Sequence, residues 1–387
     1  MKSKARFEVL DSWRGVCALL VAVMHLSTQF LYVPISQTAI VSQFYLLVDF
    51  FFVLSGFVIA HAYQESLRGG VSYVQFVIRR FGRLWPLHAA MFGVMFMLEL
   101  AKAVLSEDPL SPPFGAGGQP VYSASNLFLT HAFGFVPEPN INGPSWSISA
   151  ELWTNLLFGL VVIGARRQLY LVLGVLCVAS VAILCAFTKG QFLNATTDYG
   201  MIRCIYGFVV GVFVYRLWLS RSKPWWVGAA EIPAVLLVCV FLSLSTWQPL
   251  TMLAPLVFGM TIFIFAYEGG GVSAVMRSRP MLRVGLWSYS IYLVHWPLFV
   301  LLSRFVGFLD EHREIDLKQD YVVGGIKVTL VTFDSLLEQG LAALAALALL
   351  IVLAAVTYAV IEAPGRTFFN GIAKALAATK APLRTTH

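Results

Sequence analysis

Long apolar runs, separated by short polar segments, dominate this 387-residue chain. Runs of about 18 to 22 apolar residues cross a bilayer as helices, since a helix satisfies its own backbone hydrogen bonds in hydrocarbon. Hydrophobic residues make up 58% of the chain and charged residues only 12%, which excludes a soluble enzyme. The sequence therefore predicts an all-α, polytopic integral membrane protein. Its ten predicted transmembrane helices cover residues 12–32, 43–62, 85–104, 148–164, 169–187, 200–218, 227–245, 251–267, 286–303 and 338–361.

The positive residues predict how this bundle lies in the membrane. Most of the 27 Lys and Arg residues fall on the side of the N-terminus, so the positive-inside rule predicts that both termini are cytoplasmic. We expect one transmembrane domain over residues 1–387, with outward loops at 105–147 and 304–336 and a cytoplasmic tail at 366–387. The apolar piece at 124–136 is too short to span, which favours a re-entrant or interfacial segment.

Neither the charge nor the cysteines point to another class of protein. The net charge of +7 comes from short clusters between apolar runs, which suit membrane lipid headgroups and not nucleic acid. The cysteines follow no disulfide or metal-binding spacing, so we expect packing residues and no metal site. They are Cys17, Cys177, Cys185, Cys204 and Cys239.

Arg14 and His25 are the first informative polar residues. At about 100° per residue, their separation closes roughly three turns and places both side chains on one stripe of the first helix. Hydrocarbon excludes such groups, so each must face protein or a water-filled cavity. Structural alternatives are a histidine bonded to a neighbouring helix and an arginine that extends to the cytoplasmic interface beside Asp11. A neutral imidazole is also suited to removing a proton from a hydroxyl or carrying an acyl group.

A second cluster opens the predicted third helix. Arg79, Arg80 and Arg83 are spaced to lie on one side of a turn, and guanidinium groups suit phosphate. Anchoring to lipid headgroups accounts equally well for such a cluster. His88, farther along, is ambiguous between packing and function.

A third cluster, Asn142 to Trp153, begins the predicted fourth helix on the outward side. Glu151 enters an apolar helix in the pattern Trp-Ser-x-Ser-x-Glu, although a carboxylate near a helix start also interacts favourably with the helix dipole. Asp49 lies in the outer half of the second helix, where an interfacial position is the alternative. Gly56 in the same helix suits a close helix contact.

These stretches together resemble the membrane-bound acyltransferase 3 family, whose members O-acylate cell-surface and secreted glycans. The resemblance covers nearly the whole chain and rests on six short motifs in the same order. They contain Arg14 with His25, Asp49 with Ser55, Arg79 to Arg83, Trp146 to Glu151, Tyr292 with His295, and Glu362. The chain resembles the stand-alone members, which lack a C-terminal hydrolase-like domain.

The resemblance implies an O-acyltransferase that moves a short acyl group, usually acetyl, from cytoplasmic acetyl-CoA or another acyl-CoA to a glycan or lipid-linked oligosaccharide. It implies His25 and Glu151 at the chemical centre. In one version Glu151 orients the imidazole while His25 deprotonates the acceptor hydroxyl, and in another His25 first takes the acyl group and then passes it on. The expected donor-binding residues are Arg14, Arg79, Arg80, Arg83 and His88. The expected acceptor-binding residues are Asp49, Asn142, Trp146, Ser147 and Ser149. The expected supporting residues are Ser55, Tyr292, His295 and Glu362. A bacterial inner membrane is the expected location, and no permanently bound cofactor is expected.

Two other classes of protein remain open at this point. A transporter or flippase would use Arg14, His25 and Glu151 as a proton or substrate relay, although the hydropathy pattern shows no internal repeat. A non-catalytic scaffold for glycan assembly would leave the aligned polar stripe unexplained. Salt-dependent binding of acyl-CoA separates the enzyme from both.

Overall fold

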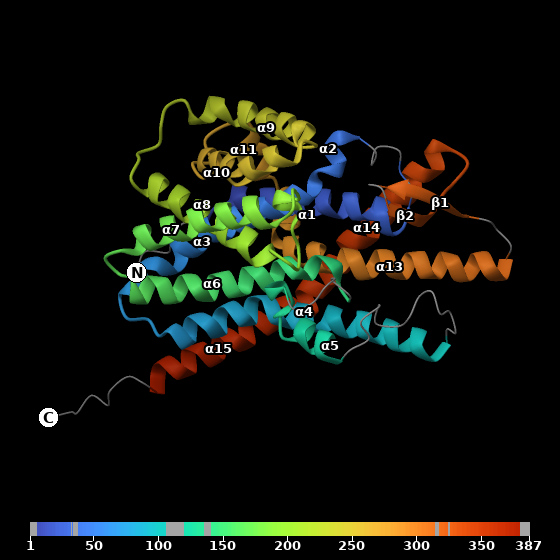
Figure 1. The fold of residues 1–387 in the computed structure, drawn as a ribbon, viewed down its shortest axis with the longest axis horizontal. Coiled ribbons are helices and arrows are strands. Elements are labelled where there is room, and N and C mark those ends of the chain that lie inside the picture. The colour runs from blue at the N-terminus through green and yellow to red at the C-terminus, as the bar shows by residue number, and fades with distance from the viewer. Residues whose placement is uncertain are drawn as a thin grey trace.

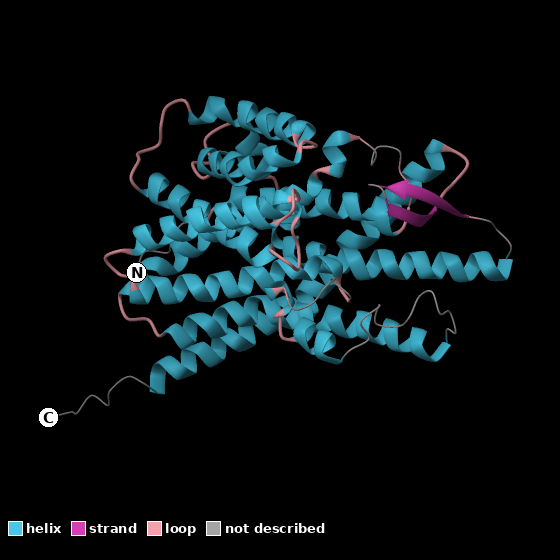
Figure 2. Ribbon diagram, viewed as in Figure 1, coloured by secondary structure: helices cyan, strands magenta, loops and turns pink. Residues whose placement is uncertain are grey.

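The computed structural model describes residues 6–31, 33, 38–105, 120–134, 141–313, 317–323 and 326–379, and these are almost entirely helical (Figures 1 and 2). The helices are α1 (Glu8–Gln29), α2 (Ala39–Ser42), α3 (Leu47–Arg68), α4 (Tyr73–Leu105), α5 (Pro120–Leu127), α6 (Trp146–Gly164), α7 (Leu169–Phe187), α8 (Gly200–Leu219), α9 (Val227–Leu244), α10 (Ala254–Phe265), α11 (Gly271–Met276), α12 (Arg279–Leu286), α13 (Ser288–Arg313), α14 (Leu336–Thr357) and α15 (Ala363–Thr379). Two strands, β1 (Lys318–Val323) and β2 (Ile326–Val331), form an antiparallel hairpin.

Ten helical segments in the described part of the chain are long and apolar enough to cross a membrane, which confirms the predicted number. They cover Glu8–Gln29, Ala39–Arg68, Tyr73–Val104, Gly143–Gly164, Leu169–Phe187, Gly200–Leu219, Val227–Leu244, Gln248–Phe265, Ser288–Asp310 and Leu336–Ala377. An even number of crossings brings the chain back to the side on which α1 begins. In Figure 1, α15 ends at the left and the β1–β2 hairpin lies at the right.

Helix α4 is much longer than predicted. It begins at Tyr73 and not near residue 85, so Arg80 and Arg83 lie inside the helix and not at its start. A transmembrane helix predicted from hydropathy ends where charged residues begin. In this protein, Glu151 and Glu362 pair with Arg80 and Arg83 in the interior and offset their charges, so the helix includes them.

The described end of the chain is helical. Helix α14 continues through a π-helical turn, Tyr358–Glu362, into α15, which ends at Thr379 and contains most of the predicted tail from residue 366; the cytoplasmic location of that tail stays a prediction. Helix α15 packs against α4: a Cβ on Gly82 would overlap the Phe369 side chain, and one on Gly365 would meet Pro86 at 2.7 Å. Residues 380–387 of the predicted tail lie outside the described residues.

The predicted outward loop at 304–336 is partly regular structure. Helix α13 extends to Arg313, and the β1–β2 hairpin follows. The Val331 N–H donates to the Phe30 carbonyl at 2.8 Å, which ties the hairpin to the end of α1. The mixed charge of this segment concealed the β-branched residues of β2. Residues 314–316 and 324–325 lie outside the described part.

Of the predicted loop 105–147, residues 106–119 and 135–140 lie outside the described part. Residues 120–134 form α5 and a short 3-10 turn, which return to the middle of α4. Trp85 donates to the Leu127 carbonyl at 3.1 Å, and the His88 ring lies 2.8 Å from the Asn126 carbonyl oxygen. The described residues of this piece therefore pack against α4, and the re-entrant or interfacial placement of 124–136 stays a prediction.

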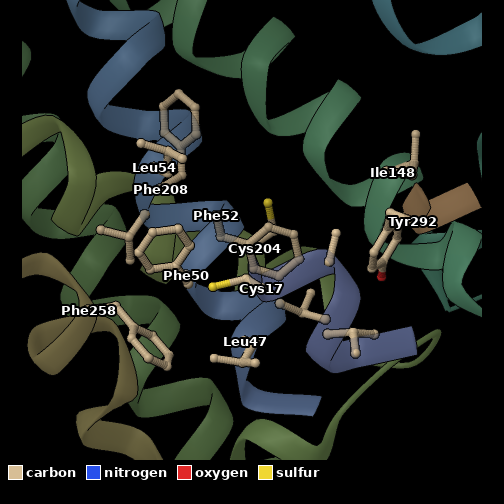
Figure 3. Close-up of a cluster of buried hydrophobic side chains, with 14 of the residues drawn as sticks. Cys17, Leu47, Phe50, Phe52, Leu54, Ile148, Cys204, Phe208, Phe258 and Tyr292 are labelled. Atoms are coloured by element: carbon tan, nitrogen blue, oxygen red, sulfur yellow. The ribbon is translucent and has the colours of Figure 1, made fainter. Parts of the chain in front are cut away.

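The core lies where α3 crosses α8. Phe50, Phe52 and Leu54 of α3 are buried beside Phe208 and Cys204 of α8 (Figure 3). A Cβ on Gly56 would overlap the Phe208 carbonyl, so the two backbones touch there, as predicted for a close helix contact. All five cysteines are free thiols, and Cys17 and Cys204 are buried packing residues.

Candidate active site

Two cavities lie in the middle of the bundle, end to end between α1, α3, α6 and α13. The first has a volume of about 110 Å³ and is called the arginine cavity; its polar lining consists of Arg14, Ser55, Arg80, Arg83, Ser147, Glu151, Ser288, Tyr289 and Tyr292. The second has a volume of about 240 Å³ and is called the histidine cavity; it is lined by Val21, Met24, His25, Tyr45, Val48, Gly143, Pro144, Trp146, Asn194, Thr196, Arg203, Tyr292 and Trp296. Val48 and Tyr292 line both.

The arginine cavity lies toward the side of the chain termini. Its residues come from the beginnings of α1, α4, α6 and α13 and from the first half and middle of α3. The histidine cavity contains the end of α1, the beginning of α3 and residues that precede α8. A small molecule that moved from one cavity to the other would therefore travel along the direction in which the helices cross the membrane.

Arg80 and Glu151 form the centre of the arginine cavity. A guanidinium nitrogen of Arg80 lies 3.3 Å from Glu151 Oε1, and the Ser55 hydroxyl donates to the same oxygen at 2.9 Å. Their side chains are 12% and 19% exposed. Arg80 Nε is buried and has no hydrogen-bond partner within the described chain, so one donor of this guanidinium remains available to an anionic ligand.

Arg83 forms the opposite wall. It makes a very short contact with Glu362, whose other oxygen accepts a hydrogen bond from the Ser290 hydroxyl at 2.8 Å. Glu362 ends the π-helical turn between α14 and α15, a kind of distortion that is frequent at functional sites. The Arg83 guanidinium also lies over the Tyr289 ring, 5.2 Å from its centroid.

Arg14 completes the cationic wall from α1. Its Nε donates to the Ser288 hydroxyl at 2.8 Å, and a terminal nitrogen lies 3.5 Å from Asp11. A Cβ on Gly15 would lie 2.6 Å from the Val284 carbonyl, so α1 and α12 approach closely and hold Arg14 beside α13. The pairing with Asp11 was one alternative from the sequence, but Arg14 also faces the cavity.

His25 pairs with His295 across α1 and α13. Its Nδ1 lies 2.9 Å from His295 Nε2, and the two rings stack with centroids 5.0 Å apart. His295 Nδ1 lies 3.3 Å from the Ile291 carbonyl oxygen, which only accepts, so His295 carries its proton on Nδ1. Its Nε2 is then the acceptor and His25 Nδ1 the donor, which leaves His25 Nε2 with a free lone pair.

Aromatic rings surround His25 in the histidine cavity. The Trp296 ring lies edge-on to His25, with centroids 5.3 Å apart. A Cβ on Gly143 would lie 2.9 Å from the Trp296 ring, and one on Gly200 would lie 2.7 Å from the Trp146 ring. The absence of a side chain at the two glycines therefore lets both indoles approach the backbone closely, and the Arg203 guanidinium lies over the Trp146 ring, 5.3 Å from its centroid.

Asp49 has a different position from the one predicted. It is fully buried, and its carboxylate accepts from Arg203 Nε at 3.0 Å and from a terminal nitrogen at 2.7 Å. Asp49 does not line the histidine cavity, whereas Arg203 does. The sequence prediction missed Arg203, although an arginine near the start of the apolar run 200–218 was the available signal.

The predicted contact between Glu151 and His25 is wrong. Glu151 lies in the arginine cavity with Arg80, and His25 lies in the histidine cavity with His295. Helix α6 begins in the middle of the bundle and not at its outer edge, so a residue one turn inside it already faces the arginines.

Two of the predicted donor-binding residues do not line the arginine cavity. Arg79 is absent from its lining. His88 is buried elsewhere: its Nε2 lies 2.8 Å from the Asn126 carbonyl oxygen, and its ring stacks with His131 at a centroid distance of 6.2 Å. His88 therefore fastens α5 to α4.

The serines and asparagine of the third cluster fix the loops around the cavities. Asn142 donates to the Leu293 carbonyl at 3.2 Å, and Ser149 donates to the Leu129 carbonyl at 2.6 Å. Ser147 lines the arginine cavity, where its hydroxyl lies 2.8 Å from the Tyr292 hydroxyl. Of the predicted acceptor-binding residues, only Trp146 lines the histidine cavity. The described residues contain no group of three or more His, Cys, Asp or Glu side chains that could hold a metal ion.

The chain is similar in sequence to several known proteins. Acyltransferase MdmB from Streptomyces mycarofaciens is 28% identical over 335 residues, covering 78% of this chain and 81% of that protein. A putative membrane-bound transacylase, BcsY, from Komagataeibacter xylinus is 24% identical, covering 79% and 76%. A putative peptidoglycan O-acetyltransferase, YrhL, from Bacillus subtilis is 23% identical, covering 66% and 44%. No solved structure matches the chain.

The sequence profile of one family, described as an acyltransferase domain, matches residues 7–361. In the described part of the chain, that match covers nine of the ten candidate membrane-crossing segments in full, the tenth up to residue 361, and both cavities. The chain is therefore an integral membrane protein that belongs to the acyltransferase 3 family.

Proposed function

We propose that this protein transfers a short acyl group, acetyl in the simplest case, from cytoplasmic acyl-CoA to a hydroxyl of a glycan or lipid-linked oligosaccharide across a bacterial inner membrane. The observation that carries the proposal is the pair of adjoining cavities, one cationic and one containing a histidine with a free ring nitrogen. Such an arrangement lets a donor and an acceptor approach one reaction centre from opposite sides.

The arginine cavity supports the donor side of the proposal. The phosphates of coenzyme A would remain at its cytoplasmic mouth, near Arg14, Arg80 and Arg83, because a phosphate is costly to move into hydrocarbon. Glu151 and Glu362 each hold one of these arginines in place. The apolar lining, which includes Phe51 and Leu54, suits the pantetheine arm with its thioester. We assign Glu151 to this donor cavity and no longer to the orientation of His25.

The histidine cavity supports the acceptor side. The half-buried Trp296 indole in its lining suits stacking against a sugar ring, and its volume of about 240 Å³ admits a single small unit. The Bacillus relative is named as a putative O-acetyltransferase that acts on a glycan, peptidoglycan. By analogy, we propose a glycan hydroxyl as the acceptor here.

The proposed chemistry takes place at His25 Nε2. This nitrogen takes the proton of the acceptor hydroxyl while the oxygen attacks the thioester carbonyl carbon. The new C–O bond replaces the C–S bond, and the thiolate leaves with the proton from the imidazolium as CoA thiol. His25 Nδ1–H donates to His295 throughout, so the ring keeps its orientation and part of its positive charge is offset. An acyl-histidine intermediate would use the same nitrogen, which the free lone pair also permits.

Mass spectrometry of surface glycan tests the proposal. Cells that carry the gene should add an acyl mass to their glycan, and cells with His25→Ala should not, although the variant protein reaches the membrane in wild-type amounts. Normal glycan acylation by His25→Ala would refute the proposed role. A transporter would predict no acyl mass and no salt-dependent binding of acetyl-CoA by the purified protein.

A further inference from the structure

Two side chains line both cavities, and together they are called the partition. Val48 of α3 and Tyr292 of α13 are the residues common to both linings. Both are buried, at 5% and 4% exposure. A group that moves from the arginine cavity to the histidine cavity therefore passes beside these two side chains.

Tyr292 is held firmly in this position. Its hydroxyl lies 2.8 Å from the Ser147 hydroxyl and donates to the Pro144 carbonyl at 3.2 Å. The Ser147 hydroxyl also lies 2.9 Å from that carbonyl oxygen, so the three groups form a hydroxyl triangle at the beginning of α6 in which two protons serve three contacts. Figure 3 shows the Tyr292 ring beside Ile148 of α6, which lines the arginine cavity.

The ring is also fixed from both sides. Phe51 contacts it edge-on, with centroids 5.5 Å apart, on the side of the arginine cavity. His295 contacts it edge-on at 5.8 Å, and His295 in turn holds His25. The partition is therefore adjacent to the proposed reaction centre, and its aromatic wall is packed too tightly to yield to a large group.

We propose that Val48 and Tyr292 set the length of the acyl chain that the protein transfers. This inference rests on the proposed function and adds the substrate class: a two-carbon acyl group reaches His25 through the partition, and longer chains are excluded by these two side chains. A pocket that discriminates by volume rejects one extra methylene by about 10- to 200-fold, so enlarging the partition should relax the preference measurably.

The test uses washed membranes that contain the full-length protein and its native acceptor, supplied with acetyl-CoA or butyryl-CoA in turn. The readout is the ratio of butyryl to acetyl transferred to glycan. We expect Val48→Ala and Tyr292→Leu each to raise this ratio by at least about tenfold. Val48→Phe, which narrows the partition, should lower acetyl transfer.

Val58→Ala is the matched control. Val58 lies on the same helix and lines the arginine cavity alone, so the same loss of two methyl groups there should leave the ratio unchanged. A general loss of packing would lower both rates together and would not change their ratio. Tyr292→Leu removes the hydroxyl triangle and is the variant more at risk of misfolding, whereas Val48→Ala removes no hydrogen bond.

The outcomes separate this inference from the function on which it rests. Acetyl transfer by Val48→Ala with a wild-type ratio would overturn the inference and leave the proposed function intact. If wild-type membranes transfer no acyl group from either thioester, the proposed function fails and the inference fails with it.

Discussion

The pairing of His25 with His295 leads to a prediction about how much each ring contributes. Substituting His295 by Phe removes the acceptor of the hydrogen bond from His25 Nδ1, which is 2.9 Å long. The acceptor residue, His295, is fully buried. In the transition state the donor of that hydrogen bond is the His25 imidazolium, and a hydrogen bond that involves a charged group contributes about 1.5–3 kcal/mol of stabilisation. At about 1.4 kcal/mol per tenfold, kcat should fall roughly 10- to 150-fold.

Other substitutions at His25 and His295 should lower the activity by more or by less than His295→Phe does. His25→Ala removes the general base itself, so we expect a loss of about 100- to 10,000-fold. His295→Gln retains an acceptor near the position of Nε2 and should recover most of the activity lost in His295→Phe. His312→Phe is the matched control, because His312 also lies 2.8 Å from the carbonyl oxygen four residues before it in α13 but is exposed.

The assay is the initial rate of acetyl transfer to glycan in washed membranes, normalised to the amount of protein in the membrane. Equal rates for His295→Phe and the wild type would refute the hydrogen-bond argument. Equal losses in His295→Phe and His295→Gln would show that His295 supports packing and does not orient His25.

Two further predictions concern the charged residues. Arg80→Gln removes charge-assisted hydrogen bonds, so it should raise the KM for acetyl-CoA by about 10- to 150-fold and weaken the salt dependence of that KM. Arg79→Gln lies outside the cavity and should leave the KM unchanged. Equal effects of the two substitutions would contradict the assignment of this cavity to the donor. Asp49→Leu leaves the buried guanidinium of Arg203 unpaired and should lower the free energy of unfolding by about 3–5 kcal/mol, measured as a lower thermal midpoint in detergent. Asp49→Leu combined with Arg203→Met should recover most of that stability. A wild-type midpoint for Asp49→Leu alone would show that the pair contributes no stability.

The ten crossings were predictable because an apolar run of bilayer length has few alternatives in hydrocarbon. The ends of elements were not. Helix α4 begins twelve residues earlier than predicted because its arginines are neutralised by Glu151 and Glu362 from other helices, which no hydropathy window records. The β1–β2 hairpin depends on pairing between strands and on a contact with the end of α1.

The candidate site was predictable in its residue types and not in its partners. The shared stripe of Arg14 and His25 follows from helical spacing, and both side chains do face α13, through Ser288 and His295. Spacing within one helix does not reveal which helix faces it, so Glu151 was assigned to His25 although it lies with Arg80. Arg203 carried the same signal as Arg14 and was overlooked.

Transfer across the membrane is the central claim, and the sidedness of labelling tests it most directly. Labelled acetyl-CoA does not cross a bilayer, so it reaches only the cytoplasmic face of sealed inverted vesicles and only the outer face of right-side-out vesicles. We predict labelled glycan inside inverted vesicles, none in right-side-out vesicles, and none in either with His25→Ala. Equal labelling in right-side-out vesicles, or labelling that persists with His25→Ala, would contradict the account.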